Sequence, residues 1–94
     1  MPRSALHYRL LHRGDRSVIQ VSGVLTKATC RRLVGAIDQV YERRSRHVTV
    51  DIARVESIDD AGRRCLLECE HRAHLLNIGF ELQPRAAVAA MSAS

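Results

Sequence analysis

The segments Val48-Thr-Val-Asp51 and Ile58-Asp-Asp-Ala-Gly62, joined by a polar link, decide the fold of this chain. An apolar strand, an acidic turn and a helix that begins near a glycine form a strand-to-helix junction. In α/β proteins, functional groups usually lie at such junctions, at the carboxyl edge of the sheet. This junction carries two carboxylates and no evident nucleophile. It therefore predicts a surface that another molecule binds, and we expect no enzymatic activity.

The pattern on either side of the junction alternates between strands and helices. Apolar runs predict strands at residues 6–11, 17–21, 48–52 and 80–83. Spacings of three and four predict one helix that begins after Thr26, with Arg43 and Arg44 in its last turn, and a second at about 61–77. Ser22-Gly23 is expected to break the second strand, and 53–60 to form a connection. A short Ala-rich helix is predicted at 85–91.

This order, β-β-α-β-α-β-α, predicts a single α/β domain spanning residues 1–94, with its core at about 6–91. The turn at 13–16 is short enough for an antiparallel hairpin. Two right-handed crossovers then make the last three strands parallel and place both long helices on one face. The result is a mixed four-stranded sheet with its helices mainly on one side.

Three cysteines, Cys30, Cys65 and Cys69, lie within apolar helical patterns. Because their number is odd, we expect buried thiols in a reducing compartment and no disulfide framework. Cys65 and Cys69 share one helix face, whereas His71 and His74 point roughly the opposite way, so these four residues do not form one metal site. We expect no metal and no cofactor.

The formal net charge is +5, and arginine supplies nearly all the positive charge. The arginines are scattered and no stacking aromatics lie between them, so an acidic protein partner is favoured over specific nucleic-acid binding. No apolar run approaches the roughly 20 residues that span a bilayer, and there is no apolar signal segment. We expect a cytoplasmic protein without membrane insertion.

The acidic turn leaves several roles open. Either aspartate can cap the second helix, and Asp60 is the better candidate of the two. The other carboxylate, Asp59, must then lie in water or meet a cation. Arg63 and Arg64 oppose the helix dipole, so they pair with local carboxylates such as Glu68 or with those of a partner. General acid–base chemistry is the least favoured role, and no glycine-rich phosphate loop is present.

Taken together, these segments resemble the STAS domain, the fold shared by bacterial anti-sigma factor antagonists and the cytoplasmic tails of sulfate transporters. The strand ending in Asp51 and the turn at 58–62 are similar to the family's strand and its (I/M)-D-S-S-G turn. Residues 21–26 resemble its L-x-G-x-L-D segment, with Thr26 in place of Asp. Residues 77–82 match G-x-x-L-x-L, and the resemblance covers roughly residues 6–91.

The departures from the family pattern bear on function. In antagonists that switch partners, a kinase phosphorylates the second serine of D-S-S-G, and that position is Ala61 here. The resemblance therefore implies no phosphorylation at the usual site. Asp60 stands where the first serine does, and Arg63 replaces a usual leucine. These changes imply a different partner, or docking without a phosphorylation switch.

The resemblance thus implies a non-catalytic module of transcription regulation and bacterial signalling, which docks an anti-sigma factor or kinase-like regulator and sequesters it. The expected docking residues are Thr26, Asp59, Asp60, Ala61, Gly62, Arg63 and Arg64. One alternative is a STAS subunit of an ABC-type lipid transport complex, bound to its ATPase subunit. Another, from a different class, is a nucleotide-binding sensor or an enzyme that uses the acidic turn. A homodimer stays open, because residues 86–91 carry an apolar stripe.

Overall fold

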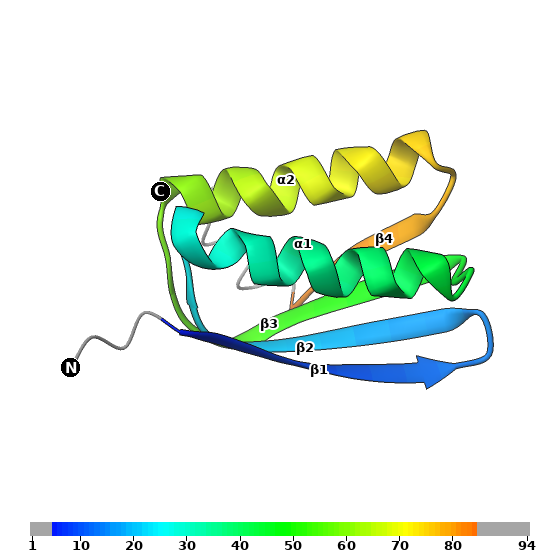
Figure 1. The fold of residues 1–94 in the computed structure, drawn as a ribbon, viewed down its shortest axis with the longest axis horizontal. Coiled ribbons are helices and arrows are strands. Elements are labelled where there is room, and N and C mark those ends of the chain that lie inside the picture. Colours follow the sequence, from blue (N-terminus) through cyan, green and yellow to red (C-terminus); the bar gives the residue numbers. More distant parts are fainter. Residues whose placement is uncertain (1–4, 85–94) are drawn as a thin grey trace.

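The computed structural model describes residues 5–84, which form a four-stranded sheet with both helices on one face (Figure 1). The elements along the chain are β1 (Leu6–Arg13), β2 (Arg16–Leu25), α1 (Lys27–Glu42), β3 (His47–Ile58), α2 (Asp60–Leu75) and β4 (Gly79–Gln83). The strand order in the sheet is β1-β2-β3-β4. The helix predicted at 85–91, and the apolar stripe that left a homodimer open, lie outside the described residues.

The pairing of the strands confirms the predicted mixed sheet. β1 and β2 form an antiparallel hairpin, and β2, β3 and β4 run parallel. Parallel neighbours need a crossover, and α1 and α2 supply the two crossovers. Both helices therefore run side by side over the same face of the sheet, with their N-termini at one end of the molecule (Figure 1).

The core lies between this sheet face and the two helices. Alternate residues of β2 and β3 point toward the helices, as the period of a strand requires. The chain has few aromatics, so the fully buried large side chains are mostly aliphatic. They include Leu6, Ile19, Val21, Leu25, Leu33, Ile37, Val40, Val48, Val50 and Leu66. Each contributes about 1.5–3 kcal/mol by its removal from water.

Two strands are longer than predicted. β2 continues through Gly23 to Leu25, and β3 continues to Ile58, so the breaks expected at 22–23 and 53–60 were wrong. The β2–β3 register shifts on both sides of Ser22 and Gly23, which absorbs the irregularity as bulges instead of ending the strands. Gly23 has φ +97°, and a Cβ there would lie 2.2 Å from the carbonyl oxygen of Ala5. Glycine thus permits the bulge.

The helix ends follow the predicted capping chemistry in most respects. The Thr26 side chain accepts a hydrogen bond from the Thr29 backbone N–H at 3.3 Å, which confirms Thr26 as the N-cap of α1. At the end of α2, Asn77 has φ +58° and the Ile78 N–H donates to the Ala73 carbonyl at 2.9 Å, which forms a left-handed C-terminal cap. Arg43, however, is the C-cap residue of α1.

Two further details of the helices differ from the predictions. Arg43 and Arg44 follow α1 instead of occupying its last turn, and Arg44 has left-handed φ +61°. α2, predicted to run to about residue 77, ends at Leu75, and Leu76 lies past it with 55% of its surface exposed.

The cysteine prediction was wrong in one respect. Cys30 of α1 and Cys65 of α2 form a disulfide, with their Cα atoms 6.2 Å apart, whereas Cys69 is a free and buried thiol. The two bonded cysteines are 35 residues apart in sequence. The crossovers place α1 and α2 side by side, which brings the two cysteines into contact. An odd cysteine count excludes complete pairing but not one bond.

No helix within residues 5–84 combines the length and the apolar character needed to cross a membrane. The longest described helices, α1 and α2, have 16 residues each. Each carries a charged outer side.

The neighbouring leucines of α2 provide a matched test of the core. We predict that Leu66→Ala, at a fully buried site, lowers the free energy of unfolding by about 2–5 kcal/mol, because it removes packed methyl groups and leaves a cavity. Leu67→Ala, at a site 49% exposed, should change it by less than about 0.5 kcal/mol. Urea unfolding measures both, and equal losses would contradict the orientation of α2.

The disulfide provides a second test. It closes a loop over a sequence separation of 35 residues, so its reduction should lower the free energy of unfolding by about 4 kcal/mol through the regained entropy of the unfolded chain. Urea unfolding with and without a reductant measures this difference. The Cys30→Ser/Cys65→Ser double variant should not respond to the reductant. A response of the same size in that variant would contradict the assignment.

Candidate functional site

The parallel pairing of β2 with β3 builds a corner at one end of the molecule. Leu25 and Ile58, the last residues of these strands, are register partners. The next residues, Thr26 and Asp59, are the N-caps of α1 and α2. The Asp59 N–H donates to the Leu25 carbonyl at 3.2 Å, which joins the two strand-to-helix turns. Both helices therefore begin at the same edge of the sheet.

Asp59, not Asp60, caps α2. Its Oδ1 accepts a hydrogen bond of 2.7 Å from the Gly62 N–H, so the preference for Asp60 as the cap was wrong. The strand continues up to Ile58, which places Asp59 in the extended conformation that a cap requires. Asp60 becomes the first helical residue, where a carboxylate favours the positive end of the helix dipole.

The charges of the first turn are partly matched to one another. The Asp60 carboxylate lies 3.8 Å from the Arg63 guanidinium, with 88% of the Asp60 side chain exposed. This pair confirms the local role expected for Arg63, and because it is exposed it contributes only about 0–1 kcal/mol. Arg64 is exposed and has no ion-pair partner among residues 5–84. Its charge therefore remains available to another molecule.

Gly62 has a structural role at the corner. It is buried, and a Cβ at this position would lie 2.2 Å from the Leu25 carbonyl oxygen. Only glycine lets α2 approach the end of β2 this closely. Gly62 was predicted among the docking residues, and the structure places it beneath the surface, where it holds the corner together.

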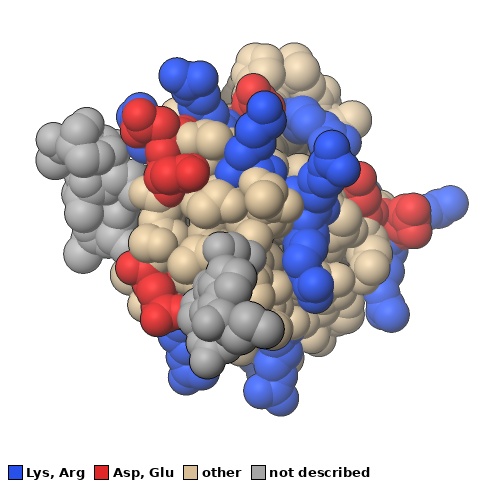
Figure 2. All heavy atoms as spheres, turned by 60° about the vertical axis from the view of Figure 1, so that its left-hand side comes forward, with Lys and Arg blue, Asp and Glu red and all other residues tan. Residues whose placement is uncertain are grey.

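The other predicted site residues lie together at the surface. Asp59, Asp60 and Arg64 are exposed, whereas Thr26 and Ala61 are half-buried. Figure 2 shows this end of the molecule, where acidic and basic side chains lie on one face around uncharged residues. The corner thus presents fixed charges of both signs to solvent.

A groove of about 620 Å³ between α1 and α2 adjoins the corner. The disulfide lies in its lining, together with Val34, Gly35 and Ala61. Its charged lining residues are Lys27, Arg31 and Arg64 near the helix starts, and Asp38 and Glu68 further along. The sequence interpretation missed this groove. The available signal was the position of Cys30 and Cys65 on the inner stripes of two adjacent helices.

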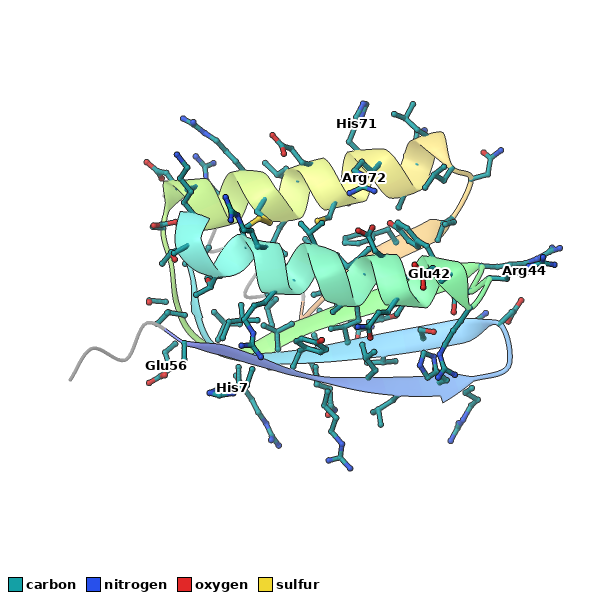
Figure 3. All side chains as sticks on the ribbon, viewed as in Figure 1. His7, Glu42, Arg44, Glu56, His71 and Arg72 are labelled. Atoms are coloured by element: carbon teal, nitrogen blue, oxygen red, sulfur yellow. A yellow bond between two sulfur atoms is a disulfide. The ribbon has the colours of Figure 1, made fainter. Side chains whose placement is uncertain are left out.

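Arg72 of α2 closes the groove further along by reaching across to α1. Its guanidinium lies 3.3 Å from the Asp38 carboxylate (Figure 3). His71, the next residue back, points away from the sheet and is exposed, as is His74. This confirms the predicted solvent-facing position of the two histidines. No group of three metal-ligating side chains occurs among residues 5–84.

Two side chains that could act as nucleophiles, Cys69 and Ser17, are buried. Burial raises the pKa of the Cys69 thiol to about 11, and nearby Arg72 lowers it only in part. This thiol is therefore protonated at neutral pH. His12 Nδ1 lies 2.9 Å from Ser17 Oγ, but Ser17 is 1% exposed and its Oγ also contacts Ser45 Oγ at 2.6 Å. Substrate cannot reach that hydroxyl.

Comparison with known proteins identifies the fold. A family model described as "Mlab, STAS domain" matches residues 9–93. An anti-sigma factor antagonist from Mycobacterium paratuberculosis superimposes with a TM-score of 0.77 and 19% identity, over 97% of this chain and 81% of that one. A STAS-domain antisigma-factor antagonist from Rhodobacter sphaeroides gives 0.71 and 14%, over 86% and 88%. These two likenesses show the fold alone.

A third similar structure is that of Mglu, with a TM-score of 0.73 and 26% identity over 81% of this chain. This chain spans only 19% of Mglu. No curated protein matches the sequence.

The two aspartates provide a matched test of the corner. We predict that Asp59→Ala lowers the free energy of unfolding by about 0.5–2 kcal/mol, because the Gly62 N–H loses its cap. Asp60→Ala removes only an exposed ion pair and should cost less than about 1 kcal/mol. Thermal unfolding compares the two. A larger loss for Asp60→Ala would contradict the assignment of the cap.

Proposed function

Because the chain belongs to the STAS domain family, we propose that it is a non-catalytic docking module that binds a regulator of the anti-sigma factor or kinase-like type. The proposed binding surface is the corner formed by Thr26, Asp59, Asp60, Ala61, Arg63 and Arg64, together with the groove beside it, and Gly62 supports this corner from beneath. The proposed setting is the bacterial cytoplasm, in a pathway of transcription regulation.

One observation carries this proposal. The position that a kinase phosphorylates in switching antagonists of the family holds Ala61, half-buried in the first turn of α2. An alanine has no hydroxyl group, so this chain cannot be turned off at that position. Asp60 beside it supplies one permanent negative charge, where a phosphate group would bring about −1.5 to −2. The surface is therefore always in one charge state.

The charges of the corner favour a partner with carboxylates near an apolar group. Arg64 has no ion-pair partner among the described residues, and Lys27 and Arg31 line the same groove. A carboxylate that reaches these cations also lies near the N-termini of two helices, whose dipoles favour negative charge. Binding then sequesters the regulator, because this protein and the regulator's other client compete for the same surface of the regulator.

A second candidate follows from the same alanine. A complex without a phosphorylation switch suits a permanent subunit, such as a STAS subunit bound to the ATPase of an ABC-type lipid transport complex. The nucleotide-binding and enzymatic alternative is less well supported. The Asp59 carboxylate already serves as the helix cap, and the sequence carries no glycine-rich phosphate loop.

A binding experiment with purified candidates tests the proposal. The candidates are the anti-sigma factors and the ABC ATPase subunits encoded in the source genome, measured by calorimetry. We predict that one of them binds, and that Arg64→Glu weakens its binding by about tenfold or more, because a paired charge becomes a repulsion. Arg13→Glu, at an exposed site in the β1–β2 hairpin, is the control and should leave binding within about twofold.

Either of two results would contradict the proposal. The first is that no candidate of either kind binds the wild-type protein. The second is that Arg13→Glu weakens binding as much as Arg64→Glu. Binding to the ATPase subunit and to no regulator would support the second candidate, a permanent transport complex, in place of the first.

A further inference from the structure

We propose that the Cys30–Cys65 disulfide is a reversible thiol–disulfide exchange site, which a dithiol reductant opens from the groove between α1 and α2. The bond joins the two helices covalently and lies in the lining of that groove. The substrate class is a small dithiol or the dithiol of a reductase protein.

The two cysteine residues differ in their exposure to solvent. Cys30 is half-buried at the groove, whereas Cys65 is 5% exposed. An incoming thiolate therefore reaches the Sγ of Cys30 first. This asymmetry gives the exchange a direction, because the attacked sulfur and the leaving sulfur are fixed by the packing of α2.

The charges of the groove favour an approaching thiolate. Lys27, Arg31 and Arg64 line it on the side of the helix starts. Of the two carboxylates in the lining, Asp38 lies 3.3 Å from the Arg72 guanidinium, which offsets its charge. A partly exposed disulfide among cations is the environment in which thiol–disulfide exchange is fast, while buried cysteines are inert.

The exchange balances as a two-electron reduction. The first thiolate of the reductant attacks Cys30 Sγ, forms a mixed disulfide and expels the Cys65 thiolate. The second thiolate of the reductant then attacks the reductant's first sulfur, which is bonded to Cys30 Sγ in the mixed disulfide, and expels the Cys30 thiolate. The dithiol leaves as a disulfide, and its two protons pass to the Cys30 and Cys65 sulfurs.

The fold allows the bond to open and close again. The Cα atoms of the two cysteines lie 6.2 Å apart, within the range that a disulfide bridges without backbone movement. Each helix is held on the sheet by its own buried residues, among them Leu33 and Leu66. The ion pair between Arg72 and Asp38 still joins the helices after reduction. The thiols thus stay close enough to re-form the bond.

The third cysteine does not divert the exchange. Cys69 lies one helical turn after Cys65, but it is 4% exposed, and burial raises its pKa to about 11. It is therefore protonated at neutral pH and a poor nucleophile. Exchange stays between Cys30 and Cys65.

One consequence concerns docking and rests on the proposed function. The cross-link holds the groove between Arg31 of α1 and Arg64 of α2 at one width. Reduction removes this covalent constraint on the groove, so the partner must restrict the spacing of the helices when it binds. We expect the oxidised protein to bind more tightly than the reduced one.

The test uses the full chain and needs no partner. Oxidised glutathione followed by denaturing alkylation should leave one modifiable thiol, Cys69, and peptide mapping should recover the Cys30–Cys65 cross-link. After dithiothreitol treatment without denaturant, the same denaturing alkylation should modify all three cysteines, and after re-oxidation it should modify only one. Cys69→Ser, the control, should form the same cross-link. Three thiols after oxidation, a cross-link to Cys69, or a bond reduced only in denaturant would each overturn the proposal.

Two variants, each lacking one of the two bonded cysteines, test the direction of attack. In Cys65→Ser, the free Cys30 should react with oxidised glutathione roughly tenfold faster than Cys65 does in Cys30→Ser, because Cys30 is the more exposed of the two groove-lining cysteines. Equal rates, or a faster Cys65, would overturn the assigned attack. Circular dichroism confirms that both variants are folded. These readouts involve no partner, so they stand or fall separately from the proposed function.

Discussion

The parallel pairing of β2 with β3, which runs up to Leu25 and Ile58, is the constraint on which the rest of the structure depends. It makes the two strands end together, so that α1 and α2 begin side by side at one edge of the sheet. Gly62 completes the arrangement, because a side chain there would strike the Leu25 carbonyl. The charged corner, the groove and the disulfide between the helices all depend on the fact that both helices begin at this edge of the sheet.

Much of this arrangement could be predicted from the sequence. The change from period two to period three or four after Thr26, and again from about Ala61, predicted the element order and hence the crossovers. The lengths of β2 and β3 could not be predicted, because Gly23 is compatible with a strand break and with a bulge. Only the pairing with β3 decides between them. Asp60 was preferred to Asp59 as the cap because the sequence did not show that β3 continues to Ile58.

The groove and the disulfide escaped prediction for a related reason. Cys30 and Cys65 each occupy an apolar stripe, and either stripe alone is typical of a buried thiol. Their contact depends on the lateral distance between two helices, which no local pattern encodes. The strand-to-helix corner was predicted from the sequence, whereas its role as a docking site stays a prediction. Gly62 supports the corner from beneath, while the groove adds Lys27 and Arg31 to the surface.

The proposed docking corner cannot change its charge by phosphorylation at residue 61, because Ala61 has no hydroxyl where switching antagonists carry a phosphorylated serine. The most direct test of this docking corner is hydrogen–deuterium exchange on the complex with the identified partner. The account predicts that amide protection on binding concentrates at residues 26–31 and 59–64. Protection confined to β1 and the helix-free face of the sheet, with no change at these two segments, would contradict it.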